Sequence, residues 1–346
     1  MSPPAAPPAS ASKRLNPPDP AGVERFACDL RRLFATAAGE DLSADARIAL
    51  AVSGGADSMA MLLLAAAAFP GQVVAATVDH GLRPEAAAEA ALVAEACTAL
   101  GVTHTTLAPA APVAGASIQR RAREARYAAL TAWAQAAGAD ALLTAHHADD
   151  QAETLLMRLN RASGVAGLSG IRPWRFEDDM PLLRPLLTWR RGALRDIAAA
   201  AGAPWVEDPS NADPRHDRTR FRALLADQPL LDPAALARSA AHLGEAEAAL
   251  DALTETLWAE RWSPGKGLLR AAGLPREARR RLVRGAVAQV RGANGIAAPD
   301  FSDGANVEAL LDALAAGKAA TQAGVLVSPE RDGSWRFTPA PPRRSL

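Results

Sequence analysis

Cysteine is scarce in this chain of 346 residues, which contains only Cys28 and Cys97. The two lie far apart, each in an apolar stretch of helical appearance, and no C-x-x-C pair occurs. This pattern excludes a zinc ribbon, a cysteine-ligated iron–sulfur cluster and a disulfide framework. We therefore expect two buried free thiols and a protein of the reducing cytoplasm.

Long apolar runs are also missing from the sequence. No stretch reaches membrane-spanning length without a charge or a break, so we expect no membrane partner. Residues 1–20 are rich in proline, alanine and serine and lack the apolar centre of a signal peptide. We expect this segment to be a disordered tail.

Neither sign of charge is in excess, since 38 basic residues balance 38 acidic ones. The net charge therefore does not indicate a nucleic-acid partner. Lysine occurs only at positions 13, 266 and 318, so any basic patch must consist of arginine, whose guanidinium suits bidentate phosphate contacts. Genome composition by itself can account for the abundance of arginine, and we favour that explanation.

A glycine-containing loop follows the first apolar run. Residues 48–52 predict a buried parallel strand, and an apolar segment of helical length begins at Asp57. The glycines between them allow a sharp turn whose N–H groups point outward at the positive end of the helix dipole. We predict a phosphate cradle with extra hydroxyl donors from Ser53 and Ser58, in which Asp57 binds Mg²⁺. The loop matches neither G-x-x-x-x-G-K-[ST] nor G-x-G-x-x-G, and a plain glycine turn with a helix cap is the alternative.

Strand and helix patterns alternate through the first half of the chain. Strands are predicted at 73–79, 103–107 and 139–145, and helices at 23–34, 84–100, 117–137, 149–161 and, from an N-cap at Thr188, to Ala201. This alternation favours an α/β fold with a doubly wound, mostly parallel sheet. Ligands of such sheets bind at the carboxyl ends of the strands, where Ser53-Gly54-Gly55, Asp79-His80 and His146-His147 fall.

The segment after the fourth strand combines histidine with carboxylates. Asp149 and Asp150 lie four and three residues before Glu153, so both pairs can share a helix face. One interpretation is structural: Asp149 caps the helix, and Glu153 completes an acidic first turn that suits the dipole. Because His146 and His147 lie beside them at a strand end, we favour a chemical role.

Arginine and alanine dominate the second half of the chain. A cluster that includes Arg218, Arg220 and Arg222 precedes helices predicted at 233–257, 275–290 and 307–316, and short β-like stretches follow at 324–327 and 335–337. Arg276, Arg280 and Arg284 recur at helical spacing, which predicts a basic face; a solvated helix surface is the alternative. We divide the chain into a tail (1–20), a catalytic domain (21–226) and a mainly helical domain (227–346).

Several motifs together resemble those of bacterial tRNA(Ile)-lysidine synthases, in the PP-loop ATP pyrophosphatase superfamily. The similarity runs from Ile48 to Phe221 through the segments SGGADS, VDHGLR, TAHHADDQAET, NRASGVAGLSGI, LLRPLL and EDPSNADPRHDRTRFR. The loop marks the superfamily, whereas HHADDQAET and EDPSN are typical of the lysidine branch. The chain departs from the family pattern at Ser117, Gln119, His216 and Thr219.

The resemblance implies a reaction in which ATP adenylates the wobble cytidine of a CAU-anticodon tRNA(Ile) and free L-lysine then displaces AMP. It implies ATP as substrate and Mg²⁺ as cofactor, with ATP bound by Ser53, Gly54, Gly55, Ala56, Asp57, Ser58, Val78 and Asp79. Catalytic roles are expected for Asp57, His147, Asp150, Glu153 and Arg126. Substrate or tRNA contacts are expected from Arg123, Asp149, Arg218, Arg222, Arg276, Arg280 and Arg284.

Three other functions are compatible with parts of the pattern. A tRNA thiolase of the same superfamily would need cysteines near the site. A small-molecule AMP-forming ligase, of the amidotransferase or NAD synthetase type, would not need an arginine-rich helical domain. A non-enzymatic tRNA-binding protein would not need Asp57. Protein partners are not indicated by the sequence.

Overall fold

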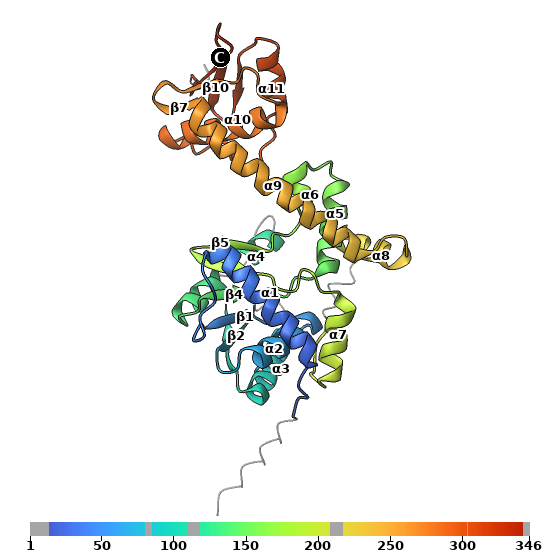
Figure 1. Cartoon of the computed structure of the whole chain (residues 1–346). Helices are drawn as coiled ribbons and strands as arrows, with labels where there is room; N and C mark the ends of the chain where they lie inside the picture. Colours follow the sequence, from blue (N-terminus) through green and yellow to red (C-terminus); the bar gives the residue numbers. More distant parts are fainter. Residues whose placement is uncertain (1–13, 80–84, 109–117, 208–216, 303, 342–346) are drawn as a thin grey trace, which may run out of the picture. The chain divides into compact units, whose positions relative to one another are not determined.

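The computed structural model describes residues 14–79, 85–108, 118–207, 217–302 and 304–341, and the chain divides into two compact units (Figure 1). The first unit ends at Gly244 and the second begins at Glu245, within the long helix α9 (Pro233–Arg261). The boundary expected from the sequence, at residue 227, coincides with the end of helix α8 (Asp217–Asp227). Each unit has a hydrophobic core of its own.

The first unit is built on a six-stranded sheet with the strand order β3-β2-β1-β4-β6-β5. Neighbouring strands are parallel except β6 and β5, which form an antiparallel hairpin at one edge. The strands are β1 (Ile48–Ala51), β2 (Val73–Val78), β3 (Thr103–Leu107), β4 (Ala141–Leu143), β5 (Trp174–Glu177) and β6 (Met180–Leu183). The predicted doubly wound α/β sheet is confirmed, and the hairpin is an addition to the strands predicted from the sequence.

Helices cover both faces of this sheet because alternate strand residues point to opposite sides. Ile48 and Leu50 join the core beneath α1 (Pro20–Ala38), α2 (Ala56–Ala68), α3 (Glu85–Leu100) and α7 (Arg191–Ala200). Ala49 instead packs with Leu130 of α4 (Ile118–Ala136) on the other face. The side chains of residues 59–64 in α2 are buried almost completely, and burying one Leu or Met contributes about 1.5–3 kcal/mol. This burial holds α2, and therefore the loop before it, firmly against the sheet.

Two local predictions are wrong. Thr188 does not cap α7, which begins at Arg191 with Arg190 at the N-cap; the Thr188 carbonyl instead accepts a hydrogen bond from Arg25. Cys97 is buried, but Cys28 is exposed, since it lies outside the stripe that α1 turns toward the core (Phe26, Ala27, Leu30 and Phe34). None of the helices in the described part of the chain is long and apolar enough to cross a membrane.

The second unit combines helices with a small antiparallel sheet. Its core packs residues of α10 (Arg276–Ala293) and α11 (Glu308–Ala315) against the sheet. The strands, in the order β7-β8-β11-β10-β9, are β7 (Trp262–Ser263), β8 (Leu268–Leu269), β9 (Ala320–Gln322), β10 (Val325–Pro329) and β11 (Trp335–Pro339). The helical character of this region is confirmed. The β-like stretches noted at the end of the sequence are β10 and β11, and the other strands are too short to be recognised by periodicity.

Candidate active site

The loop between β1 and α2 presents main-chain N–H groups at a helix start. Gly55 is the N-cap of α2 and no side chain caps this helix, so its first N–H groups are available to an anion. Gly54 has φ +83°, a conformation that favours glycine. The Ser58 hydroxyl donates to the Gly55 carbonyl (2.9 Å) and accepts from the Ser53 N–H (3.2 Å), so it braces the loop. Donation from Ser58 to phosphate stays a prediction, since its hydroxyl is used within the loop, whereas the Ser53 side chain is exposed.

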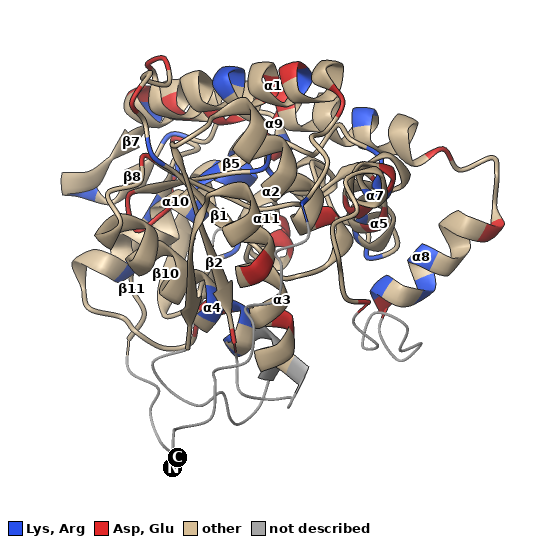
Figure 2. Cartoon of the chain, turned by 90° about the horizontal axis from the view of Figure 1, so that it is seen from below, with Lys and Arg blue, Asp and Glu red and all other residues tan. Residues whose placement is uncertain are grey.

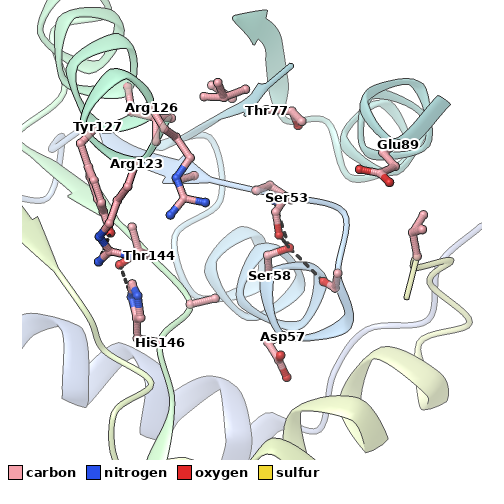
Figure 3. Close-up of a pocket in the computed structure, with 18 of the residues that line it drawn as sticks. Ser53, Asp57, Ser58, Thr77, Glu89, Arg123, Arg126, Tyr127, Thr144 and His146 are labelled. Atoms are coloured by element: carbon pink, nitrogen blue, oxygen red, sulfur yellow. Dashed lines mark hydrogen bonds between the residues drawn. The ribbon is translucent and has the colours of Figure 1, made fainter. Parts of the chain in front are cut away.

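This loop opens into a pocket of about 450 Å³ at the carboxyl ends of the strands (Figure 3). The loop contributes Ser53, Gly55, Asp57 and Ser58 to its lining. A segment distant in sequence supports the loop, because the Val206 N–H donates to the Gly54 carbonyl (2.9 Å). The pocket lies where the doubly wound sheet predicts a ligand site.

His147 joins the loop to the carboxylate segment. It is the N-cap of helix α5 (Ala148–Leu159), where its Nδ1 accepts from the Asp150 N–H (3.2 Å) and the Asp150 carboxylate accepts from the His147 N–H (3.1 Å). Its Nε2 lies 3.4 Å from Asp57 Oδ2 and 3.5 Å from Asp150 Oδ2. The structural alternative, in which Asp149 caps α5, is not what is observed, because the capping bonds run between His147 and Asp150.

The capping bond determines which ring nitrogen of His147 carries a proton. Since Nδ1 accepts from a main-chain N–H, the proton of the neutral ring lies on Nε2 and faces Asp57. Burial disfavours the charged imidazolium, but the hydrogen bond to Asp57 and the charges of Asp150 and Asp57 raise the pKa of His147. The titratable ring of His147 therefore lies between Asp57, in the loop before α2, and Asp150.

One carboxylate oxygen of Asp57 makes no hydrogen bond to the described residues. This atom, Oδ1, is buried. Mg²⁺ commonly binds through one or two carboxylates together with substrate phosphates, and an unpartnered oxygen beside a phosphate loop suits that arrangement. The described residues contain no group of three or more His, Cys, Asp or Glu that could enclose a metal. The site thus fits Mg²⁺ that arrives with a nucleotide and does not fit a metal cage made by protein alone.

Two arginines of α8 hold the carboxylates of α5. Arg218 donates to Glu153 (2.6 Å) and to Asp150 (2.5 Å), and Arg222 donates to Glu153 (2.7 Å). Burial alone would lower the pKa of Arg218, but its interactions with Asp150 and Glu153 raise it. Asp150 and Arg218 line the pocket, whereas Glu153 lies behind them with its side chain 2% exposed.

Asp149 points to a different part of the molecule. It accepts from the Arg191 N–H (2.8 Å) and from two nitrogens of Arg190, at the start of α7. Burial acts to raise the pKa of Asp149, but these bonds and the charge of Arg190 lower it below its usual value. Asp149 is absent from the pocket lining, so its geometry indicates a structural tie between α5 and α7.

Positive charge also gathers around Tyr127, another residue that lines the pocket. The guanidinium carbons of Arg175, Arg123 and Arg126 lie 4.9, 5.0 and 5.5 Å from the centre of its ring. Figure 3 shows Arg126 extending from α4 into the pocket, while Arg123 lies beside Tyr127 and donates to its hydroxyl (3.3 Å). Such a group of guanidinium ions is suited to offset charge on a phosphate or carboxylate.

His146 differs from its neighbour in charge. Burial, together with Arg184 and Arg123, holds the pKa of His146 well below its usual range. Its Nδ1 lies 3.0 Å from the hydroxyl of Thr144. His146 therefore faces the pocket as a neutral ring.

The end of β2 has main-chain groups that the sheet does not use. The last β1 pair joins Ala51 to Ala76, so β1 stops two residues before the level of Val78. Because main-chain groups of successive residues in a parallel strand point to alternate sides, those of Val78 face this gap. The Asp79 N–H already donates to the Leu107 carbonyl (2.8 Å). Of the two residues predicted to receive adenine, Val78 lines the pocket and has the more accessible main chain.

Some lining residues were not singled out from the sequence. They are the polar residues Thr77, Glu89 and Thr144, and the aromatic residue Tyr127. Thr77 and Thr144 occur at strand ends, which is a usable signal, whereas Glu89 is one of several similar helix residues. His80, Ser117 and His216 lie outside the described residues, as does the side chain of Gln119.

The arginines expected to contact tRNA from α10 all have partners in the second unit. Arg276 pairs with Glu308 (2.7 Å) and Asp312 (2.6 Å), and Arg280 with Glu308 (2.5 Å). Arg284 donates to the Ala305 carbonyl (2.8 Å). Their role in tRNA binding stays a prediction.

Comparison with known proteins places the pocket in a family context. Residues 24–228 match the model of the PP-loop domain. The chain is 43% identical over 315 residues to the tRNA(Ile)-lysidine synthase of Novosphingobium aromaticivorans, covering 88% of this chain and 92% of that protein. It is 41% identical over 305 residues to the corresponding synthase of Zymomonas mobilis, covering 86% and 90%. The structure is similar to a U34-tRNA thiolase of Methanococcus maripaludis, with a TM-score of 0.50 at 17% identity, over 64% of this chain and 80% of that one. The last similarity concerns the fold alone.

Proposed function

This chain belongs to the tRNA(Ile)-lysidine synthase family of PP-loop enzymes, and we propose that its pocket carries out both steps of lysidine formation. In the first step the C2 oxygen of the wobble cytidine of a CAU-anticodon tRNA(Ile) attacks the α-phosphorus of ATP, and diphosphate leaves. In the second step the ε-amine of free lysine forms a bond to C2, AMP leaves with that oxygen, and the amine loses its proton.

The observation that carries this proposal is the position of His147 between two functional groups. Its Nε2 is 3.4 Å from Asp57 in the phosphate loop and 3.5 Å from Asp150 in the carboxylate segment. A nucleotide bound at the loop and an amine bound at Asp150 would therefore meet in one pocket. Holding both reactants beside each other is itself a large part of catalysis.

For the ATP half, the N–H groups at the start of α2 and the Ser53 hydroxyl bind phosphate, and Arg126 offsets its charge. The Val78 main chain receives adenine. The free oxygen of Asp57 would hold Mg²⁺, which would neutralise phosphate charge when bound.

For the lysine half, the ε-ammonium has a reference pKa of about 10.4 and must lose a proton before it attacks. Of the acidic residues Asp149, Asp150 and Glu153, Asp150 is the one that lines the pocket, so we assign to it the binding of this group. Because Arg218 already donates to Asp150 (2.5 Å), an incoming ammonium competes with that guanidinium. Glu153 holds Arg218 and Arg222 from behind. The hypothesis that Glu153 also contacts lysine stays a prediction.

A thiolase is not supported by the cysteines. Cys97 is buried in α3, and burial raises the pKa of its thiol to about 12, which disfavours the reactive thiolate. Cys28 lies on α1, and neither cysteine lines the pocket.

Nucleoside analysis tests the proposal directly. The full chain is incubated with ATP, Mg²⁺, isotopically labelled lysine and either the CAU tRNA(Ile) transcript or the elongator tRNA(Met) transcript. We expect labelled lysidine and AMP with the isoleucine transcript only. AMP formation that does not depend on tRNA would instead indicate a small-molecule ligase and would overturn the proposal.

A further inference from the structure

A second pocket, of about 310 Å³, lies where the end of α5 meets α8. It is lined by Asn160 and by four residues of α8: Asp217, Arg220, Phe221 and Leu224. It shares no lining residue with the 450 Å³ pocket beside the loop between β1 and α2, which is called the ATP pocket from here on. The mechanism described above makes no use of it.

Helix α8 presents two sets of side chains on adjacent faces, one that contacts α5 and one that lines the second pocket. Arg218 and Arg222, four residues apart, turn toward the carboxylates of α5. The lining residues 217, 220, 221 and 224 follow the spacing i, i+3, i+4, i+7, so they share an adjacent face. No residue of α8 is buried, so this partly apolar face belongs to none of the hydrophobic cores formed by the described residues. The blue positions along α8 in Figure 2 show that the same helix is rich in arginine.

The chemistry of this face suits a flat ring that is joined to a phosphate. Phe221 is half-buried and Leu224 is 41% exposed, which together provide an apolar surface. Asp217 is paired with Arg161 (2.6 Å), so its negative charge is offset. Arg220 is exposed and forms no hydrogen bond or ion pair with any described residue, and the same holds for the side-chain amide of Asn160. An aromatic ring, an amide and an available guanidinium are the groups that bind unstacked RNA bases.

We propose that this pocket holds an unstacked nucleobase of the tRNA that neighbours the wobble cytidine, stacked on Phe221, with Asn160 at the base edge and Arg220 at its phosphate. The inference rests on the proposed function, which requires the wobble cytidine to leave the anticodon stack and reach the ATP pocket. The set of α8 side chains that contacts α5 holds Asp150 and Glu153, so one helix carries both the second pocket and an arginine that lines the first. RNA loops are usually recognised through bases splayed out in this way.

The test measures binding of a CAU-anticodon stem–loop RNA to the full chain by fluorescence anisotropy. Phe221→Leu keeps an apolar side chain but removes the aromatic face, and we expect affinity to fall about tenfold. Phe221→Tyr keeps the face and should bind within about twofold of the wild type. Phe176→Leu is the control, since Phe176 is a phenylalanine of the same unit, on β5, that is 51% exposed, and its change should have no effect.

Abasic substitution in the RNA identifies the bound base. One loop position next to the wobble cytidine should weaken wild-type binding when made abasic and should not weaken Phe221→Leu further, because both changes remove the same contact. Arg220→Gln and Asn160→Ala alter exposed side chains only and repeat the test if Phe221→Leu does not fold.

The outcomes separate this proposal from the proposed function. If Phe221→Leu, or Arg220→Gln and Asn160→Ala in its place, binds like the wild type while the wild type forms lysidine, the nucleobase pocket is wrong and the enzyme assignment stands. The nucleobase pocket would also be wrong if the loss of RNA affinity in Phe221→Leu added to the loss caused by an abasic site at every loop position tested. If the wild type forms no lysidine, both proposals fall.

Discussion

Each unit of the chain contains a cluster in which two arginines hold one glutamate. In the first unit, Arg218 and Arg222 hold Glu153, whose side chain is 2% exposed. In the second unit, Arg276 and Arg280 hold Glu308, whose side chain is 40% exposed. The distances are alike, at 2.6 and 2.7 Å in the first cluster and 2.7 and 2.5 Å in the second.

The difference in burial gives these similar clusters different consequences. An exposed ion pair contributes about 0–1 kcal/mol, because water and salt can replace either partner. A buried carboxylate that loses its partner cannot turn to water, so breaking such a pair is costly. The first cluster can therefore fix the positions of Arg218 and Asp150, which line the ATP pocket. The second can open to admit another anion at little cost.

The largest effect is expected where the buried cluster reaches the phosphate loop through His147. Asp57→Asn should preserve the fold and lower AMP formation by at least about a hundredfold, the usual scale for loss of a key electrostatic group. The measurement is the rate of AMP formation at saturating Mg²⁺ and tRNA, with circular dichroism as the control for folding. Near-normal turnover would exclude the metal role of Asp57.

The next effect compares the two glutamates directly. Glu153→Gln should impair lysine transfer more than tRNA binding, and should destabilise the chain by less than the roughly 3–5 kcal/mol of a fully buried pair, since Arg218 and Arg222 keep contact with solvent. Glu308→Gln should change stability by no more than about 1 kcal/mol and leave turnover unchanged. Urea unfolding and steady-state kinetics measure both. Equal destabilisation by the two variants, or a Glu153→Gln defect confined to tRNA affinity, would contradict this comparison.

A smaller effect concerns the salt dependence of tRNA binding. If Arg276, Arg280 and Arg284 contact phosphates, replacing all three by Ala should flatten the log–log salt slope by about two, at roughly 0.7 per contact. ATP affinity should not change, because the described residues of the ATP pocket all belong to the first unit.

Glu308→Gln is the matched control for this experiment. It removes the carboxylate that Arg276 and Arg280 share, while Arg276 keeps Asp312 and Arg280 keeps Glu277, and it should strengthen tRNA binding at low salt. An unchanged slope in the triple variant would mean that these arginines serve only the ion pairs of the second unit.

The smallest effect is a pH dependence of stability. Hydrogen bonds from Arg280 and Arg276 lower the pKa of Glu308 from 4.5 to about 2. A lowered folded-state pKa means that this contribution is complete above about pH 4.5 and is lost as the pH falls toward about 2. Because Glu308 is well exposed, the contribution should stay below about 1 kcal/mol. The difference in melting temperature between the wild type and Glu308→Gln should shrink over this window; a constant difference would contradict it.

Local patterns in the sequence were sufficient for the central sheet and the phosphate loop. The runs at Ile48 and Val73 are apolar and bounded by charge or glycine, so strands were expected where β1 and β2 lie. The hairpin of β5 and β6 was not recognised, because each strand has only four residues: β5 (WRFE) alternates over too short a run, and β6 (MPLL) does not alternate. Short strands of this kind depend on the edge that the rest of the sheet offers them.

The roles of the three acidic residues show where local patterns stop. The spacing of Asp149, Asp150 and Glu153 placed them on one helix and made any of them a candidate for the site. The structure turns Asp149 to α7 and Glu153 to α8, and leaves Asp150 at the pocket. Their partners, Arg191 and Arg222, lie 42 and 69 residues further along the chain.

By itself, the sequence determined the glycine-containing loop after β1, the parallel sheet that carries it and the family-like set of residues around it. These features depend on turns and periodicities within a few neighbouring residues. Only the tertiary structure decided which acidic residue of α5 lines the ATP pocket. It also decided that Ser58 hydrogen-bonds within the loop, and that the arginines of α10 are already paired. The physical reason is that helical spacing specifies the face of a side chain, whereas its charge state and availability depend on the residue that folding places opposite to it.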